Sequence, residues 1–179
     1  MHHSMKLYSR HREIFIRAYI FFGKWTRIPV IGRLVRAVAN AYGAGVTRAY
    51  LLNYAEAREI VANARGIALS PCTCRAVFKN CDHPVQAELM IGASRHAFIH
   101  ERPAAHREIS KDEALDILKK CHEGGLMHTI VKCRDEYYAI CNCCTCCCVP
   151  YRLQKNYGIG KALSRNNNIV REFKKLLPQ

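Results

Sequence analysis

The sequence lacks a hydrophobic run of about 18 residues, the length of a membrane-spanning helix, and its first residues lack the apolar stretch of a secretory signal. These absences favour a cytoplasmic protein. The sequence also contains no glycine-rich phosphate loop and no Ser/His/Asp signature, and Gly43-Ala44-Gly45 lacks the third glycine and the preceding strand of a dinucleotide site. Flavin and nicotinamide chemistry therefore have no support.

Cysteine and acidic residues are scarce in whole regions of the chain. None of the 11 cysteines lies outside residues 72–148. Residues 1–70 hold 3 acidic against 11 basic side chains and residues 151–179 hold 1 against 7, so the flanks carry the net charge of +14. An odd number of cysteines without an export signal argues against a secreted disulfide framework. The cysteines are therefore expected to remain reduced, to bind metal or to take part in redox chemistry.

The elements that the sequence does contain predict one α+β domain, mostly helical, with a small β-hairpin that presents the cysteines. We expect a basic amphipathic helical arm (1–53), a cysteine-rich iron–sulfur core (54–150) and a basic tail with a short helix (151–179). Helical spacing predicts helices over 10–25, 31–42 and 85–98, and in the first of these Arg12, Arg17 and Lys24 lie opposite the apolar side. Capping signals predict three more helices: from Asn53-x-x-Glu56 to Gly66, from Ser110-x-x-Glu113 to Gly124, and over 169–177 after Asn168. Residues 129–133 and 137–141 predict the hairpin. A helix before a hairpin also occurs in winged-helix proteins, but three elements do not establish that fold.

The cysteines fall into two groups along the chain. They are Cys72, Cys74 and Cys81, and then Cys141, Cys143, Cys144, Cys146, Cys147 and Cys148. One core cannot absorb six thiols in eight residues, because adjacent side chains point in different directions, so the pattern predicts a metal or cluster site near the hairpin. The overlapping CxxC spacings are crowded for one zinc ion. Metallothioneins use such tandems but nearly lack aromatic residues, whereas this chain has 1 Trp, 9 Tyr and 6 Phe.

Iron–sulfur clusters take sets of four thiolates from separate loops, so eight of the 11 thiols would satisfy two [4Fe–4S] centres. We therefore predict one or two such clusters, with zinc as the alternative. His83 and His128 are candidate ligands or hydrogen-bonding partners of a cluster, and Arg75 is a candidate counter-charge. Cys121 is expected in the core of its helix, and Cys133 fits either role.

The cysteine region resembles an iron–sulfur region of ferredoxin-type proteins from anaerobic bacteria and archaea. The resemblance covers about residues 54–150 and rests on four motifs: Pro71-Cys72-Thr73-Cys74-Arg75 with Cys81-Asp82-His83-Pro84, the Ser110 to Leu115 helix start, Gly125-Leu126-Met127-His128, and the string from Cys141 to Cys148. It implies an iron–sulfur protein of anaerobic redox metabolism.

The chain departs from this family at two places. It lacks the further cysteine that relatives carry in the stretch Val85 to Leu89, so Glu88, His83 or a cysteine of the second group would complete the first set. It also lacks the C-terminal CxxCxxCxxxCP ferredoxin module, so the chain would pass electrons to a partner protein or act alone.

The basic flanks would attract phosphate, but no nucleic-acid signature accompanies them, and solvated helix faces account for most of the charge. Nucleic acid is therefore not the expected partner. Residues 10–38 combine large apolar side chains with Arg and Lys, which suits a peripheral membrane contact or a partner helix. A basic surface would also steer an acidic ferredoxin. The sequence does not predict the oligomeric state.

Three functions remain open. The first is electron transfer to or from a redox partner through one or two [4Fe–4S] clusters. The second is an enzyme whose cluster has an open or non-cysteine-ligated iron that binds substrate. The third is a zinc–thiolate regulatory module whose winged-helix-like elements contact nucleic acid.

Overall fold

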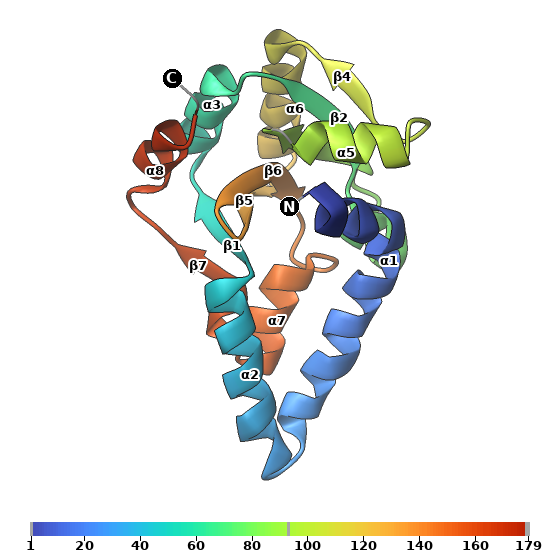
Figure 1. Ribbon diagram of the computed structural model, residues 1–179, viewed down its shortest axis with the longest axis vertical. Helices are drawn as coiled ribbons and strands as arrows, with labels where there is room; N and C mark the ends of the chain where they lie inside the picture. Colours follow the sequence, from blue (N-terminus) through green and yellow to red (C-terminus); the bar gives the residue numbers. More distant parts are fainter. Residues whose placement is uncertain (1, 93, 178–179) are drawn as a thin grey trace.

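The computed structural model describes residues 2–92 and 94–177 (Figure 1). Its helices are α1 (His2–Lys24), α2 (Ile31–Gly45), α3 (Tyr54–Asn63), α4 (Thr73–Phe78), α5 (Ser94–Glu101), α6 (Lys111–Glu123), α7 (Val149–Tyr157) and α8 (Ile169–Lys175), with short 3-10 turns at η1 (Trp25–Arg27) and η2 (Gly160–Ala162). Helix α1 bends at His11, whose backbone angles are not helical. This bend lays the first turns of α1 beside α5, while the rest of the helix runs away from the sheet (Figure 1).

Seven strands form one mixed sheet in the order β4-β2-β3-β6-β5-β1-β7. They are β1 (Thr47–Leu52), β2 (Ile67–Pro71), β3 (Gln86–Ile91), β4 (Arg107–Ile109), β5 (Met127–Cys133), β6 (Glu136–Cys143) and β7 (Leu163–Arg165). All neighbours are antiparallel except β1 and β7, which are parallel. The expected hairpin is thus the β5–β6 pair at the centre of a larger sheet.

Alternate side chains of each strand serve the two faces of the sheet, as the period of an extended chain requires. Leu89, Ile130 and Ile140 are fully buried on the face covered by α3, α6 and α8. Met90 and Ala139, one position along, are fully buried on the opposite face against α5. The second face also receives the start of α1, and it is the face toward which Cys141 points.

Helices α1, α2 and α7 extend below the sheet; α1 and α2 meet at a narrow end, and α7 lies between them and ends nearer the sheet (Figure 1). Ile16 and Ile20 of α1 pack against Val149 and Tyr157 of α7, which fixes the three helices around a common interior. Within the described residues, no helix is long and apolar enough to cross a membrane.

The α+β class and the single domain are confirmed, and so are several local signals. Asn53 and Glu56 form a complete capping box, and the Ser110 side chain accepts a hydrogen bond from the Glu113 backbone. Asn168 stands at the start of α8, but its side chain makes no capping bond. Strands β1 and β7, from the two flanking regions, complete the same sheet as the cysteine-rich centre.

Two expectations about particular segments are wrong. Of the helix expected over 85–98, residues 86–91 form strand β3 and only the end belongs to a helix, α5, because residues 87–91 are buried on both faces of the sheet, where period-2 and helical patterns look alike. Arg12 does not lie on a solvated face: it is 6% exposed, while Phe21 of the expected apolar side is 55% exposed. Helix α1 therefore buries a different face from the one its apolar spacing indicated.

Candidate metal centre

Four cysteine thiols from two loops meet at one point, and we call them the compact thiol set: Cys81, Cys144, Cys146 and Cys147. Their four Sγ atoms lie within 4.8 Å of one another. The Sγ of Cys81 is 3.6 Å from that of Cys144 and 4.0 Å from that of Cys147. Four thiols at such distances can bind a metal ion, because tetrahedral thiolate sites need this grouping.

The backbone around the compact thiol set holds the two loops together. Cys81 follows α4, and the other three lie in the turn between β6 and α7. Asn80 joins the loops: its backbone N–H donates to Cys147 Sγ at 3.3 Å, and its side-chain amide donates to the Cys146 carbonyl at 3.0 Å. Burial raises the pKa of Cys144, but the Cys147 backbone and Arg75 donate hydrogen bonds to the thiolate and bring the pKa to about 7. Cys144 is thus prepared to act as a thiolate ligand.

Five further thiols, which we call the cavity thiols, lie beside the compact set: Cys72, Cys74, Cys141, Cys143 and Cys148. Cys141 and Cys143 share one face of β6, because alternate strand residues point the same way. The thiols of Cys141 and Cys148 donate to Cys143, so the pKa of Cys143 lies well below its ordinary value. The cavity thiols are more spread out than the compact set, which is the one group of the described chain close enough to hold a single ion.

Arg75 is a buried cation between the two thiol groups. It is 1% exposed, and its guanidinium donates to the Asn142 carbonyl at 2.9 Å and to the Pro84 carbonyl. None of the ion pairs formed by the described residues involves Arg75, and its Nε has no hydrogen-bond partner. Desolvation lowers the pKa of Arg75, but interaction with the thiolate forms of Cys72 and Cys144 raises it above its usual value. A buried cation requires an anionic partner, and Cys144, whose pKa is brought to about 7, can supply it, whereas burial raises the pKa of Cys72 and favours its thiol.

Asn142 ties the hairpin together from the side opposite the thiols. Its amide nitrogen donates to the Ala87 carbonyl at 2.8 Å, so its oxygen accepts from Nδ1 of His128 at 2.7 Å. The second ring nitrogen of His128 meets His122 at 3.3 Å. Burial lowers the pKa of His128, so the neutral ring is favoured. Both ring nitrogens are engaged within the described residues, with Asn142 and His122 as their partners, and His128 orients the Asn142 side chain.

Glu88 and Arg12 form a buried ion pair beside Cys141, on the face of the sheet opposite the Asn142 side chain. Glu88 is 1% exposed, accepts from the Arg12 guanidinium, and lies 3.5 Å from the Cys141 thiol. The charge of Glu88 is thus balanced by α1, and the cysteines of the second group, rather than Glu88, surround Cys81.

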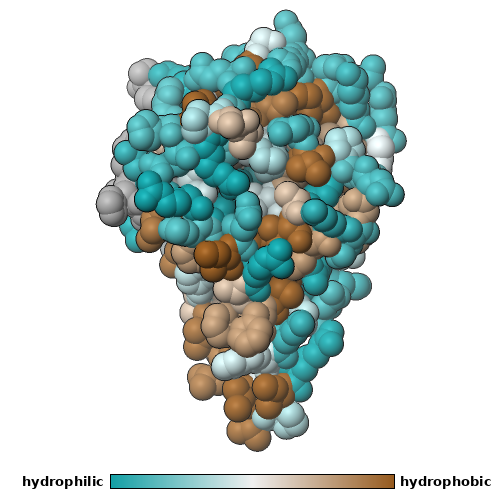
Figure 2. All heavy atoms as spheres, turned by 90° about the vertical axis from the view of Figure 1, so that its right-hand side faces the viewer, coloured by the Kyte–Doolittle hydropathy of each residue, from teal (hydrophilic) through white to brown (hydrophobic). Residues whose placement is uncertain are grey.

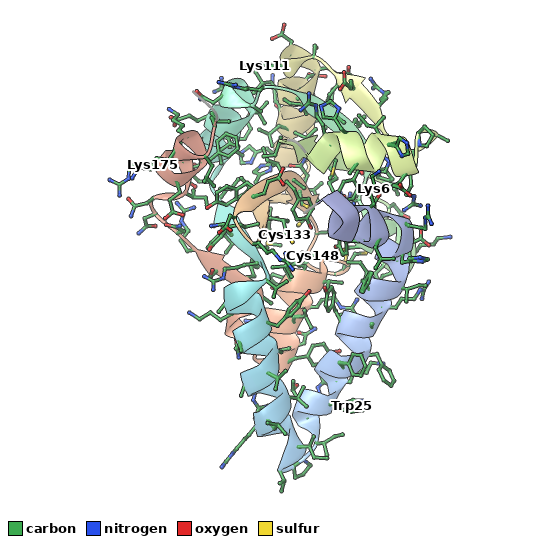
Figure 3. The ribbon with its side chains drawn as sticks, viewed as in Figure 1. Lys6, Trp25, Lys111, Cys133, Cys148 and Lys175 are labelled. Carbon is green, nitrogen blue, oxygen red and sulfur yellow. The ribbon has the colours of Figure 1, made fainter. Side chains whose placement is uncertain are left out.

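A cavity of about 630 Å³ opens between α1, α2 and α7 and reaches the sheet. Its inner end is formed by the cavity thiols, Cys144, Glu88 and Arg12, and its walls are apolar side chains of the three helices. Figure 3 shows Cys148 at the top of α7, facing this space.

No known family, curated protein or solved structure that we compared matches this chain. Its function must therefore be argued from the thiols themselves, and above all from the grouping of four cysteines that could hold a metal ion.

The two groups of cysteines in the structure differ from the two groups along the sequence. Cys81 leaves its sequence neighbours and joins three cysteines of the second group. His83 is half-buried after Cys81 and outside the compact set. Cys121 is buried in the apolar cluster beneath that set, as its helical position predicted, and Cys133 lies outside both groups.

Sequence reasoning did not assign three residues that shape the site: Asn80, Asn142 and Arg12. Asn80 and Asn142 each directly precede a cysteine, and this adjacency is a local signal for a side chain that fixes a thiol-bearing loop. Arg12 carries no such signal, because its partner Glu88 is 76 residues away.

Proposed function

We propose that this chain is an iron–sulfur redox protein that exchanges electrons with a partner protein. In this proposal the cavity thiols hold one [4Fe–4S] cluster, and the compact thiol set holds one tetrahedrally coordinated metal ion. The observation that carries the proposal is the convergence of nine thiols in two adjacent sets around a buried arginine that forms no ion pair with a carboxylate of the described residues.

The arrangement of each set supports a different type of centre. A single tetrahedral ion with metal–sulfur bonds of about 2.3 Å places its thiolates about 3.8 Å apart. The compact thiol set has separations of 3.6, 3.8 and 4.0 Å, which suits one ion. A cubane cluster takes four thiolates from separate loops, and the cavity thiols come from two segments: Cys72 and Cys74 at the start of α4, and Cys141, Cys143 and Cys148 at and after the end of β6.

The charge around the thiols supports an anionic centre. A four-thiolate [4Fe–4S] cluster carries a net negative charge in its usual oxidised state and supplies one-electron chemistry. Arg75 lies between the two sets and would balance that charge from inside the protein. Thr129 Oγ1, 3.6 Å from Cys143 Sγ, would hydrogen-bond a ligand sulfur.

Partner access is favoured by the position of the compact thiol set. Cys81 and Cys146 are partly exposed, whereas Cys147 is fully buried. One edge of the set is thus open to a docking protein, and the basic flanks of the chain would attract an acidic one.

A zinc–thiolate module is the second candidate, and the Sγ separations of the compact set favour it specifically. Zinc would use these four thiols and leave the cavity thiols reduced. It would have no electron to exchange, so its role would be structural or regulatory.

Anaerobic purification followed by iron, acid-labile sulfide and zinc analysis tests the proposal. We expect about four irons and four sulfides per chain, one additional tetrahedral metal, and a reversible low-potential EPR signal. Cys143→Ser should lower the sulfide content, while the matched control Cys133→Ser should not. Zinc without sulfide would establish the second candidate instead, and a chain without metal would overturn both.

A further inference from the structure

The narrow end of the molecule exposes an unusual amount of apolar surface. Of the 14 exposed large apolar side chains of the described residues, 12 lie between Leu7 and Tyr42. Eight of these, which we call the α1–α2 tip, surround the turn between the helices: Phe21, Phe22, Trp25, Ile28, Val30, Ile31, Leu34 and Val38. Figure 2 shows hydrophobic residues gathered at this end, and Figure 3 places Trp25 there. A patch of this kind marks an interaction site.

The three aromatic residues of the α1–α2 tip are exposed and also pack against one another. The rings of Phe21, Phe22 and Trp25 pack edge-on with centroids 5.4 to 5.8 Å apart. Val30, at the apex, is 89% exposed and has a positive φ of 66°, which is unfavourable for a β-branched residue. Contacts within the chain give no reason for valine at this position.

The charge of this segment indicates what covers the α1–α2 tip. Between residues 14 and 55 there is no Asp or Glu, and the basic side chains there are Arg17, Lys24, Arg27, Arg33, Arg36 and Arg48. Lys24, Arg27 and Arg33 are exposed next to the apolar residues. A second copy of the chain would bring these cations against each other. An anionic lipid surface satisfies both features, because its acyl region takes apolar side chains and its headgroups pair with cations.

The cavity begins behind the same residues. Phe22, Trp25 and Leu34 line its outer part, and the cavity thiols line its inner end. The buried Arg12–Glu88 ion pair also lies at the inner end. An apolar space with one charged pair at its end suits an apolar molecule that carries a single polar group.

We propose that the α1–α2 tip docks on an anionic bilayer and that the cavity takes up a lipid-soluble molecule bearing one polar group. The polar group would lie toward the Arg12–Glu88 pair at the inner end, and the apolar part would lie between α1, α2 and α7. This site goes beyond electron exchange with a protein partner, because it brings a small molecule beside the cavity thiols.

Vesicle binding tests the docking step on the metal-loaded full chain, with Trp25, the one tryptophan of the chain, as the reporter. We expect vesicles of phosphatidylcholine with phosphatidylglycerol to sediment the protein and shift Trp25 emission to the blue, with brominated lipids quenching it. Pure phosphatidylcholine should bind at least tenfold more weakly, and added salt should weaken the anionic binding.

Matched variants separate the α1–α2 tip from general hydrophobicity. Leu34→Asp should weaken vesicle binding at least tenfold, while Leu176→Asp, the same change at a residue 50% exposed beyond α8, should not. Val30→Gly removes an apolar side chain where the positive φ suits glycine, so the fold survives and binding should still fall. Absence of binding at every lipid composition, equal losses in both Asp variants, or self-association abolished by Leu34→Asp would overturn the docking step.

Cavity uptake is tested without vesicles, using dibromostearate as the probe. We expect saturable quenching of Trp25 at one probe per chain. Ala39→Phe fills the cavity and should abolish the quenching, whereas Ala37→Phe, on the exposed side of α2, should leave it unchanged. Quenching that does not saturate, or that survives Ala39→Phe, contradicts uptake. Metal content is measured in the same samples, so failure of this proposal is distinguishable from failure of the metal centre.

Discussion

Substitution of Asn142 by leucine tests how the chain holds its thiol-bearing strand in place. Asn142 is fully buried between Cys141 and Cys143, and leucine has a similar size but no hydrogen-bonding groups. The change removes the 2.7 Å bond from His128 and the 2.8 Å bond to the Ala87 carbonyl. The His128 N–H then has no acceptor in the interior, and the Ala87 carbonyl loses one donor.

The expected destabilisation follows from these two losses. A buried polar group left without its partner costs about 1–3 kcal/mol. We therefore expect Asn142→Leu to lower the free energy of unfolding by about 2–5 kcal/mol, a large part of the 5–15 kcal/mol typical of a domain. Asn63→Leu is the matched control: its bond to the Glu59 carbonyl is exposed to solvent, so the change should stay within about 0.5 kcal/mol.

Anaerobic urea unfolding followed by circular dichroism measures both variants at fixed metal content. A double-mutant cycle with His128→Phe should give a coupling energy of about 1 kcal/mol or more, because each substitution removes the same bond. A loss below about 1 kcal/mol for Asn142→Leu, or additive effects of the two substitutions, would refute the claim that this pair supports the site.

Three further predictions follow from other parts of the structure. Leu118→Ala, at a fully buried position of α6, should lower the free energy of unfolding by about 2–5 kcal/mol in urea titration. A loss below about 1 kcal/mol would contradict the close packing around Leu118, because it would mean that the neighbouring side chains fill the cavity left by the substitution. Arg75→Met should weaken metal binding about ten- to a hundredfold in competitive chelation, since charged hydrogen bonds are worth about 1.5–3 kcal/mol, and unchanged affinity would remove its role as counter-charge. The hydrogen bonds from Arg165, at 2.5 and 2.6 Å, lower the pKa of Glu56, so this pair stabilises the fold above the ordinary glutamate pKa and the contribution is lost as pH falls through the lowered value. The stability difference between the wild type and Arg165→Gln should therefore shrink with acidification, and a pH-independent difference would contradict the assignment.

Local signals predicted much of the helical structure and the central hairpin. The Asn53–Glu56 and Ser110–Glu113 caps mark helix starts because the bonds involved span three residues. The β5–β6 hairpin was visible as two apolar runs joined by a short turn. Strand β3 was not, because a strand buried on both faces loses the alternation that separates it from a helix.

The chemistry of the site was predicted better than its geometry. Six thiols in eight residues predict a grouping that could hold a metal ion, and three of them do come together with Cys81 in the compact thiol set. The pairing of Cys81 with Cys144, which are 63 residues apart, depends on how α4 and the β6–α7 turn pack. The burial of Arg12 depends on the bend in α1, and no spacing rule on one helix reveals its partner Glu88 on another element.

The content of iron, acid-labile sulfide and zinc in the anaerobically purified chain tests the central claim most directly. The account predicts iron and sulfide in equal amounts, about four of each per chain, with one further metal ion in the compact thiol set. One zinc ion per chain with no sulfide, or a folded chain that holds no metal, would contradict it.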